Sequence, residues 1–205
     1  MKKLIVIVHG GNADYRLDDE IKTRPIAKNT YSIHMGNPSF GEVLDKYVDL
    51  NKFEVQAPLF PNATDANYTE WARFLDQIIS QSVGNANDKF SGIILIGHSL
   101  GTVCLQRYLT ENDIKTKFGL NLLQLHLLGC CSREGNFQTS SDWSKLIENT
   151  KQIFLYHSTD DSVCPYSEME FYITHLPKAK RHIFTSQGHF EGPKVPELLE
   201  NLDLA

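Results

Sequence analysis

The sequence predicts an α/β fold: one domain over residues 1–205, built on an open, mostly parallel sheet of about six strands with helices on both faces. Three observations predict it. Short runs rich in Val, Ile and Leu alternate with amphipathic segments along the chain. Several runs are apolar throughout, as is typical of parallel strands that are covered on both faces. No internal repeat and no linker rich in Gly, Ser or Pro divides the chain.

Six segments have the length and the flanking residues of buried strands. In chain order they are Leu4–Val8, Phe53–Ala57, Ile93–Ile96, Leu123–Leu128, Ile153–His157 and His182–Thr185. The first run follows two lysines and so begins like a signal peptide, but its five apolar residues are too few for a secretory core. No run approaches the ~18 apolar residues of a membrane span. We therefore expect a buried first strand and no membrane span.

Helices are expected between the strands, where apolar residues recur at helical spacing. In chain order they are Phe40–Val48, Tyr68–Ile79, Ser99–Leu109, Trp143–Ile147, Ser167–Leu176 and Val195–Leu202. Residues 12–38 differ, since they are mostly polar and have no clear period. A connection of that length is typically functional. We expect a long loop or insertion here, near the end of the first strand.

Composition and charge exclude several classes of protein. With 41% hydrophobic and 22% charged residues, the chain is neither collagen-like nor disordered. Its net charge of −5 argues against a nucleic-acid partner, because such proteins carry a basic excess. The local cluster of Lys178, Lys180 and Arg181 is interpreted as a solvated turn before a strand.

The four cysteines match no recognised metal-binding or redox motif. Cys104, Cys130, Cys131 and Cys164 include no C-x-x-C pair and have no metal-ligand spacing. We therefore expect buried, reduced thiols in a cytoplasmic protein, and no metal site.

The motif that predicts chemistry is Gly-His-Ser-Leu-Gly at residues 97–101, which follows an apolar strand and precedes a helix. In a G-x-S-x-G turn of this kind the serine lies on a tight, strained bend that lifts its hydroxyl above the sheet edge. Cβ atoms at Gly97 and Gly101 would clash with neighbouring backbone. The motif predicts a nucleophile elbow with Ser99 as the nucleophile. The alternative is a glycine-rich turn whose serine caps the helix.

A serine nucleophile needs a general base, and the base needs a carboxylate that orients it. The strand Ile153–His157 leads into Asp160 and Asp161, at the carboxyl end where open α/β sheets build their sites. The residues alone do not choose between the two aspartates. An Asx turn or a helix N-cap is the non-catalytic alternative for this pair.

Three histidines follow the acid, and His189 is the expected base. It lies just beyond the last strand, after a glycine that lets the loop turn. His175 falls inside a predicted helix and His182 begins a strand, so neither is placed at the carboxyl edge. A lone surface histidine is the non-catalytic alternative for His189.

Two backbone amides are expected to bind the oxyanion that develops on a substrate carbonyl. One belongs to Leu100, the residue after the nucleophile. The other is assigned to Gly11, in the compact His-Gly-Gly segment that follows the first strand. His9 itself is interpreted as a structural residue that packs or hydrogen-bonds beneath this loop.

Three segments together resemble the α/β-hydrolase superfamily: Gly97–Gly101, the Asp-Asp-Ser-Val-Cys-Pro run at 160–165, and Gly188–Phe190. More narrowly, the chain resembles small serine hydrolases of the retinoblastoma-binding-protein-9 type. Those enzymes also have His-Gly after the first strand and a proline-rich segment before a tryptophan helix, as at 58–61 and Trp71 here. The resemblance spans residues 4–202. It implies that the acid is Asp161, four residues before the proline.

The resemblance further implies hydrolysis of esters or amides without a cofactor and without a large cap domain. Two departures stand out. The 12–38 segment is longer than in compact members, and Cys164 replaces a frequent valine, which we interpret as a harmless, volume-conserving change. We expect a shallow cleft, lined by residues 12–38 and 129–144, that accepts short acyl groups.

The leading hypothesis is therefore a serine hydrolase of small esters, with amides and thioesters as further substrates, acting through Ser99, His189 and Asp161. Its expected partner is a small-molecule substrate, and no feature indicates a protein partner. The alternatives are a non-catalytic protein-binding module on the same scaffold, and an acyltransferase. A cysteine nucleophile is not favoured, because neither Cys104 nor Cys131 lies at the elbow.

Overall fold

The computed structural model describes residues 1–11, 44, 47–84, 89–132, 135–138, 141–190 and 196–202. The loop expected over residues 12–38 lies outside them, as does all of the helix expected over Phe40–Val48 except residues 44, 47 and 48. No helix within the described ranges has the length and apolar character needed to cross a membrane.

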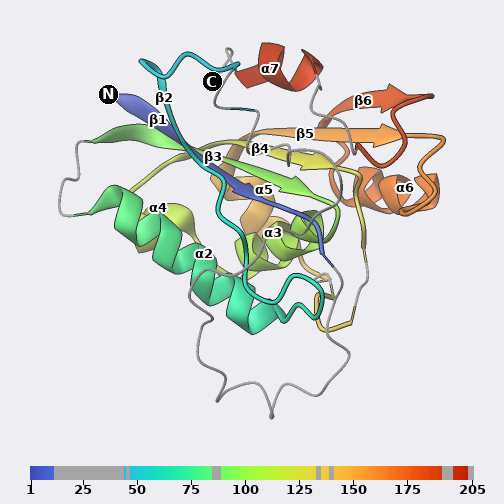
Figure 1. Ribbon diagram of the computed structural model, residues 1–205, viewed down its shortest axis with the longest axis horizontal. Helices are drawn as coiled ribbons and strands as arrows, with labels where there is room; N and C mark the ends of the chain where they lie inside the picture. Colours follow the sequence, from blue (N-terminus) through green and yellow to red (C-terminus); the bar gives the residue numbers. More distant parts are fainter. Residues whose placement is uncertain are drawn as a thin grey trace.

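Six strands form one sheet in the order β2-β1-β3-β4-β5-β6, and every neighbouring pair is parallel. The strands are β1 (Lys2–Val8), β2 (Phe53–Gln56), β3 (Phe90–His98), β4 (Leu122–Leu128), β5 (Thr150–Ser158) and β6 (Lys180–Phe184). The chain begins inside the sheet, adds β2 on one side and then adds β3 to β6 in turn on the other (Figure 1). The predicted α/β class is confirmed. Because the strands are parallel, their carboxyl ends lie along one edge, where open sheets build sites.

The inner strands β1 and β3 carry long apolar runs because both of their faces are covered. In β1, Leu4, Val6 and Val8 belong to one apolar cluster, whereas Ile5 and Ile7 belong to a second. Successive side chains of a strand point to opposite faces, so the two clusters lie on opposite sides of the sheet. This is the burial that the continuous Val, Ile and Leu runs predict.

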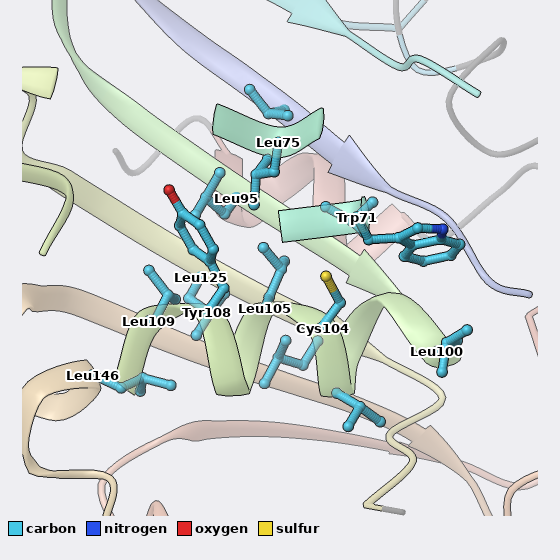
Figure 2. Close-up of a cluster of buried hydrophobic side chains, with 14 of the residues drawn as sticks. Trp71, Leu75, Leu95, Leu100, Cys104, Leu105, Tyr108, Leu109, Leu125 and Leu146 are labelled. Carbon is cyan, nitrogen blue, oxygen red and sulfur yellow. The ribbon is translucent and has the colours of Figure 1, made fainter. Parts of the chain in front are cut away.

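Helices cover both faces unequally. Among the described residues, five helices contribute to the first cluster: α2 (Tyr68–Val83), α3 (Leu100–Glu111), α4 (Ile114–Phe118), α5 (Ser144–Asn149) and α6 (Tyr166–His175). On the opposite face lies α7 (Pro196–Leu202) (Figure 1). Figure 2 shows Trp71 and Leu75 of α2 and Cys104 and Leu105 of α3 directed into the larger cluster. This packing fixes α3, the helix that follows Ser99, against the sheet.

One short helix, α4 (Ile114–Phe118), was not predicted. Asp113 caps its start by accepting the N–H of Lys115 at 2.8 Å, and Gly119 ends it with a φ of 73°. Both are ordinary helix boundary signals. Five residues are too few for an apolar period, so only the caps could have indicated it.

Between α3 and β5 the described residues hold only α4, β4, α5 and their connections. They include no further domain. The described residues form a single α/β domain without a cap, in agreement with the predicted fold class.

The expectation of four reduced thiols is wrong for two of them. Cys131 and Cys164 form a disulfide, with Cα atoms 5.8 Å apart, whereas Cys104 and Cys130 are free and buried. The bridge spans 33 residues of sequence and so forms no short motif. It arises because the loops after β4 and β5 meet at the carboxyl edge of the sheet. Cys164 is therefore more than a replacement for valine, and the argument from reduced thiols to a cytoplasmic protein no longer holds.

Candidate active site

The predicted nucleophile, acid and base follow three strands of the sheet at the same edge. Ser99 lies directly after β3, Asp161 follows β5, and His189 follows β6. Because the strands are parallel, the segments that follow them all begin at the carboxyl edge of the sheet.

Ser99 has the strained backbone that the motif predicts. Its φ is 53°, a region that residues with a side chain seldom occupy. Three hydrogen bonds hold it there: its N–H donates to Leu128 O at 2.9 Å, and its carbonyl accepts from the N–H (2.8 Å) and the Oγ1 (2.7 Å) of Thr102. A Cβ at Gly101 would lie 2.0 Å from Val8 O, and one at Gly97 would lie 2.7 Å from Gly101 O. The backbone packing around Ser99 therefore requires glycine at both positions.

His189 contacts Asp161 and not Asp160. The distance from His189 Nδ1 to Asp161 Oδ2 is 2.8 Å. The other carboxylate oxygen, Oδ1, accepts the N–H groups of Val163 and Cys164 at 2.9 and 2.8 Å. Both oxygens of Asp161 are thus bonded, and its side chain has no exposed surface.

Asp160 supports the loop that carries the histidine. Its Oδ1 accepts the N–H of Gly188 at 3.0 Å and also the hydroxyl of Ser158. The Ser158 bond is the main cause that lowers the pKa of Asp160. The two neighbouring aspartates therefore differ in role: one bonds the imidazole ring, and the other bonds the backbone just before it.

The elbow and the histidine loop both lie beside the segment after β4, but the second ring nitrogen of His189 makes no hydrogen bond to Ser99. When Nδ1–H donates to the carboxylate, the lone pair of the neutral ring lies on Nε2. That atom is buried and has no hydrogen-bond partner within the described ranges. A Cβ at Gly129 would lie 3.1 Å from His189 Cε1, and the preceding residue, Leu128, accepts the N–H of Ser99. The Ser99 hydroxyl itself lies 3.9 Å from Cys131 Sγ.

His98 joins the elbow to the histidine loop, a role that the sequence analysis missed. Its Nε2 lies 2.7 Å from the backbone carbonyl of His189, and the two ring centroids are 4.9 Å apart. Burial lowers the pKa of His98 to about 4, with the neighbouring His189 as a second cause. At pH 7 the ring is neutral, and its Nε2–H donates to that carbonyl. The second position of the motif, His98, gave no signal for this contact, because the contact depends on a loop 91 residues away.

The loop after β1 lies directly beside the nucleophile. A Cβ at Gly10 would lie 2.9 Å from Ser99 Cβ, and one at Gly11 would lie 2.6 Å from Ala63 O. His9 Nε2 accepts the N–H of Phe60 at 2.8 Å, and its Nδ1 lies 2.5 Å from Gly10 O. These contacts confirm the predicted structural role of His9.

Leu100, the other predicted oxyanion donor, is the first residue of α3. The N–H groups of the first turn of a helix have no acceptor within the helix.

The remaining histidines after the acid lie away from the rim. His175 bonds Phe171 O within α6, and His182 bonds Asn201 of α7. The predicted positions of His175 in a helix and His182 in a strand are confirmed. His157 lies beneath the acid, with Nε2 2.9 Å from Cys164 O and 3.8 Å from Asp161 Oδ2. Burial lowers the pKa of His157, so this ring is neutral at pH 7. The described residues contain no group of three or more His, Cys, Asp or Glu side chains that could hold a metal ion.

The sheet order, the elbow after β3 and the acid and histidine after β5 and β6 define an α/β-hydrolase fold. Solved structures agree. The ydeN gene product of B. subtilis matches with a TM-score of 0.66 and 17% identity, over 100% of this chain and 98% of that chain. XC6422 from Xanthomonas campestris, described as a member of the a/b serine hydrolases without lid, matches with a TM-score of 0.55 and 12% identity, over 98% of this chain and 79% of that chain.

Among curated proteins, the chain is similar to serine hydrolase RBBP9 of Rattus norvegicus. The two are 27% identical over 151 residues, which is 72% of this chain and 75% of the relative. No protein-family model matches the chain. The resemblance stated from the sequence motifs thus agrees with both kinds of comparison.

Proposed function

We propose that this protein is a serine hydrolase that cleaves small esters through Ser99, His189 and Asp161. The observation that supports this most strongly is the bond between His189 Nδ1 and an Asp161 carboxylate whose other oxygen accepts two backbone amides. That arrangement fixes the tautomer and orientation of the ring and leaves its lone pair on Nε2, as a general base requires. The similarity to a curated serine hydrolase supports the same assignment.

The proposed reaction proceeds by acyl transfer to the serine. Ser99 Oγ attacks the ester carbonyl while His189 Nε2 takes the hydroxyl proton, and the ring then gives that proton to the leaving alcohol. The Leu100 and Gly11 amides bind the oxyanion. Water, activated by the same ring, releases the acid from the acyl-enzyme. Asp161 balances the charge of the imidazolium in both steps.

The proposed substrates have short acyl groups. The described residues include no cap domain that could enclose a long chain. Amides and thioesters are cleaved by the same chemistry, and we expect them as slower substrates or as alternatives to esters.

The experiment is a series of p-nitrophenyl esters, from acetate to palmitate, with the wild type, Ser99→Ala and His189→Ala. We expect turnover of the shortest esters, a decrease with chain length, and a loss of at least about 1,000-fold in either variant. Turnover that persists in Ser99→Ala would contradict the proposal, and a preference for palmitate would contradict the substrate class.

A further inference from the structure

The Cys131–Cys164 disulfide connects the two loops that surround the candidate triad. Cys131 follows β4, and Cys164 lies three residues after Asp161. Both residues are nearly buried, with exposed fractions of 6% and 5%. Their neighbour Val163 is 58% exposed, so the loop between the acid and the bridge faces solvent.

At one end of the bridge, Cys164 itself holds the acid. Its N–H donates to Asp161 Oδ1 at 2.8 Å, beside the N–H of Val163 at 2.9 Å. Its carbonyl accepts a hydrogen bond from His157 Nε2 at 2.9 Å. A shift of Cys164 would therefore move the groups that fix the Asp161 carboxylate.

At the other end, Cys131 is fixed to the elbow. Its N–H donates to Thr102 Oγ1 at 3.0 Å, and the same hydroxyl donates to Ser99 O at 2.7 Å. The Tyr172 hydroxyl donates to Cys131 O at 2.6 Å, which adds a contact from α6. The disulfide thus links the hydrogen bonds of the nucleophile turn, made through Thr102, to those of the acid loop, made through Cys164.

We propose that this disulfide positions Asp161 against His189, and that its reduction by a dithiol lowers the activity of the triad. The inference rests on the proposed serine hydrolase function. In the reduction, a dithiol gives two electrons and two protons to the bridge, becomes a cyclic disulfide, and leaves thiols at Cys131 and Cys164. The acid loop is then held by hydrogen bonds alone. The Asp161 carboxylate is no longer fixed to the elbow, so the ring of His189 loses its orientation.

A merely structural bridge would change stability without changing catalysis in the folded protein. Two readouts separate these roles. Loss of the orienting carboxylate lowers kcat and leaves KM nearly unchanged, because the acid does not bind the substrate. It also removes the downfield proton NMR signal of the His189 Nδ1–H that donates to Asp161.

The experiment compares the oxidised wild type with protein that has been reduced with dithiothreitol and freed of it by gel filtration without oxygen. Removal of the dithiol matters, because thiols cleave activated esters themselves. Alkylation and peptide mass spectrometry count the thiols, circular dichroism verifies the fold, and p-nitrophenyl acetate measures kcat and KM. We expect kcat to fall at least tenfold, KM to change less than threefold, and the downfield signal to disappear.

The bridgeless variant Cys131→Ala/Cys164→Val should match the reduced wild type and should not respond to dithiothreitol. Cys130→Ala, which removes a free buried thiol beside the bridge, should respond like the wild type. A kcat that stays within twofold once both thiols are free would overturn the inference, as would unfolding of both the reduced protein and the bridgeless variant. If the oxidised wild type shows no Ser99-dependent turnover, the proposed function fails. Even in that case, the NMR signal of His189 Nδ1–H tests whether the disulfide positions Asp161. If reduction leaves this signal unchanged, the inference is overturned.

Discussion

Hydrogen bonds fix the protonation of the buried histidines around Ser99. His9 accepts the N–H of Phe60 through Nε2, so its proton is on Nδ1, next to Gly10 O. Burial lowers the pKa values of His9 and His98, the latter to about 4. Both rings are neutral at pH 7 and act as fixed hydrogen-bonding groups. His189 differs in its partner, because its Nδ1 bonds a carboxylate, whereas the other two rings bond backbone groups.

The neighbouring aspartates provide a matched test of which residue orients the base. Asp161→Asn should lower kcat about 1,000-fold or more, because an amide stabilises neither the required tautomer nor the imidazolium. Asp160→Asn should lower kcat less than tenfold, since an amide oxygen can still accept the N–H of Gly188. Steady-state hydrolysis of p-nitrophenyl acetate measures both. Equal losses in the two variants would contradict the assignment.

His98 should act through the position of His189. His98→Ala removes the donor to the His189 carbonyl, and we expect kcat to fall about 10- to 100-fold with KM within twofold. His98→Gln retains a side-chain N–H donor and should recover part of the loss. An alanine variant with wild-type kcat would show that the contact does not position the base.

At the scale of the element, the turn between β3 and α3 depends on close backbone approach. A methyl group at Gly101 would lie 2.0 Å from a backbone atom of β1, Val8 O, which has no flexible side chain to move aside. Gly119 is a useful contrast: its φ is 73°, but nothing lies within 4 Å of its Cβ position. A substitution at Gly101 would force α3 away from the sheet, whereas one at Gly119 would strain only that residue.

We therefore expect Gly101→Ala to lower the free energy of unfolding by about 3 kcal/mol or more, and Gly119→Ala by ~1 kcal/mol. Urea unfolding followed by circular dichroism measures both. Comparable losses would mean that backbone strain, and not the approach of α3 to β1, explains why glycine occurs at the elbow.

The elements that the sequence predicted were those encoded within a few consecutive residues. The apolar strands and the Gly-His-Ser-Leu-Gly turn depend on local spacing, and both were located correctly. The choice between Asp160 and Asp161 required a family resemblance, because it depends on where the loop after β6 lies. The disulfide was missed for the same reason: Cys131 and Cys164 are brought together by the topology of the sheet and by no sequence motif.

At the scale of the whole molecule, buried neutral histidines make stability depend on pH. Burial lowers the pKa of His98 to about 4 and that of His126 to about 3, from 6.5. The unfolded chain therefore binds protons at these residues below pH 6.5, while the folded chain does not. Their contribution to stability is complete above pH 6.5 and is lost progressively as the pH falls toward the folded pKa values.

Between pH 7 and pH 5 the free energy of unfolding should fall by roughly 2 kcal/mol for each of these histidines, about 4 kcal/mol together. Urea titrations at intervals of pH measure the change. His126→Gln, which removes one of these groups, should reduce the fall between pH 7 and pH 5 by roughly 2 kcal/mol, whatever its effect on stability at pH 7. A wild-type pH dependence in this variant would show that other groups are responsible.

The features discussed at the three scales meet at the carboxyl edge of the sheet. The elbow, the acid loop, the histidine loop and the disulfide all lie along it. The most direct measurement at this edge is peptide mapping after reaction with a fluorophosphonate, which modifies only an activated serine. We expect one adduct, on Ser99, that forms at least about 1,000-fold more slowly in His189→Ala and is absent in Ser99→Ala. An adduct elsewhere, or a His189→Ala variant that reacts at the wild-type rate, would contradict the proposal that His189 activates Ser99.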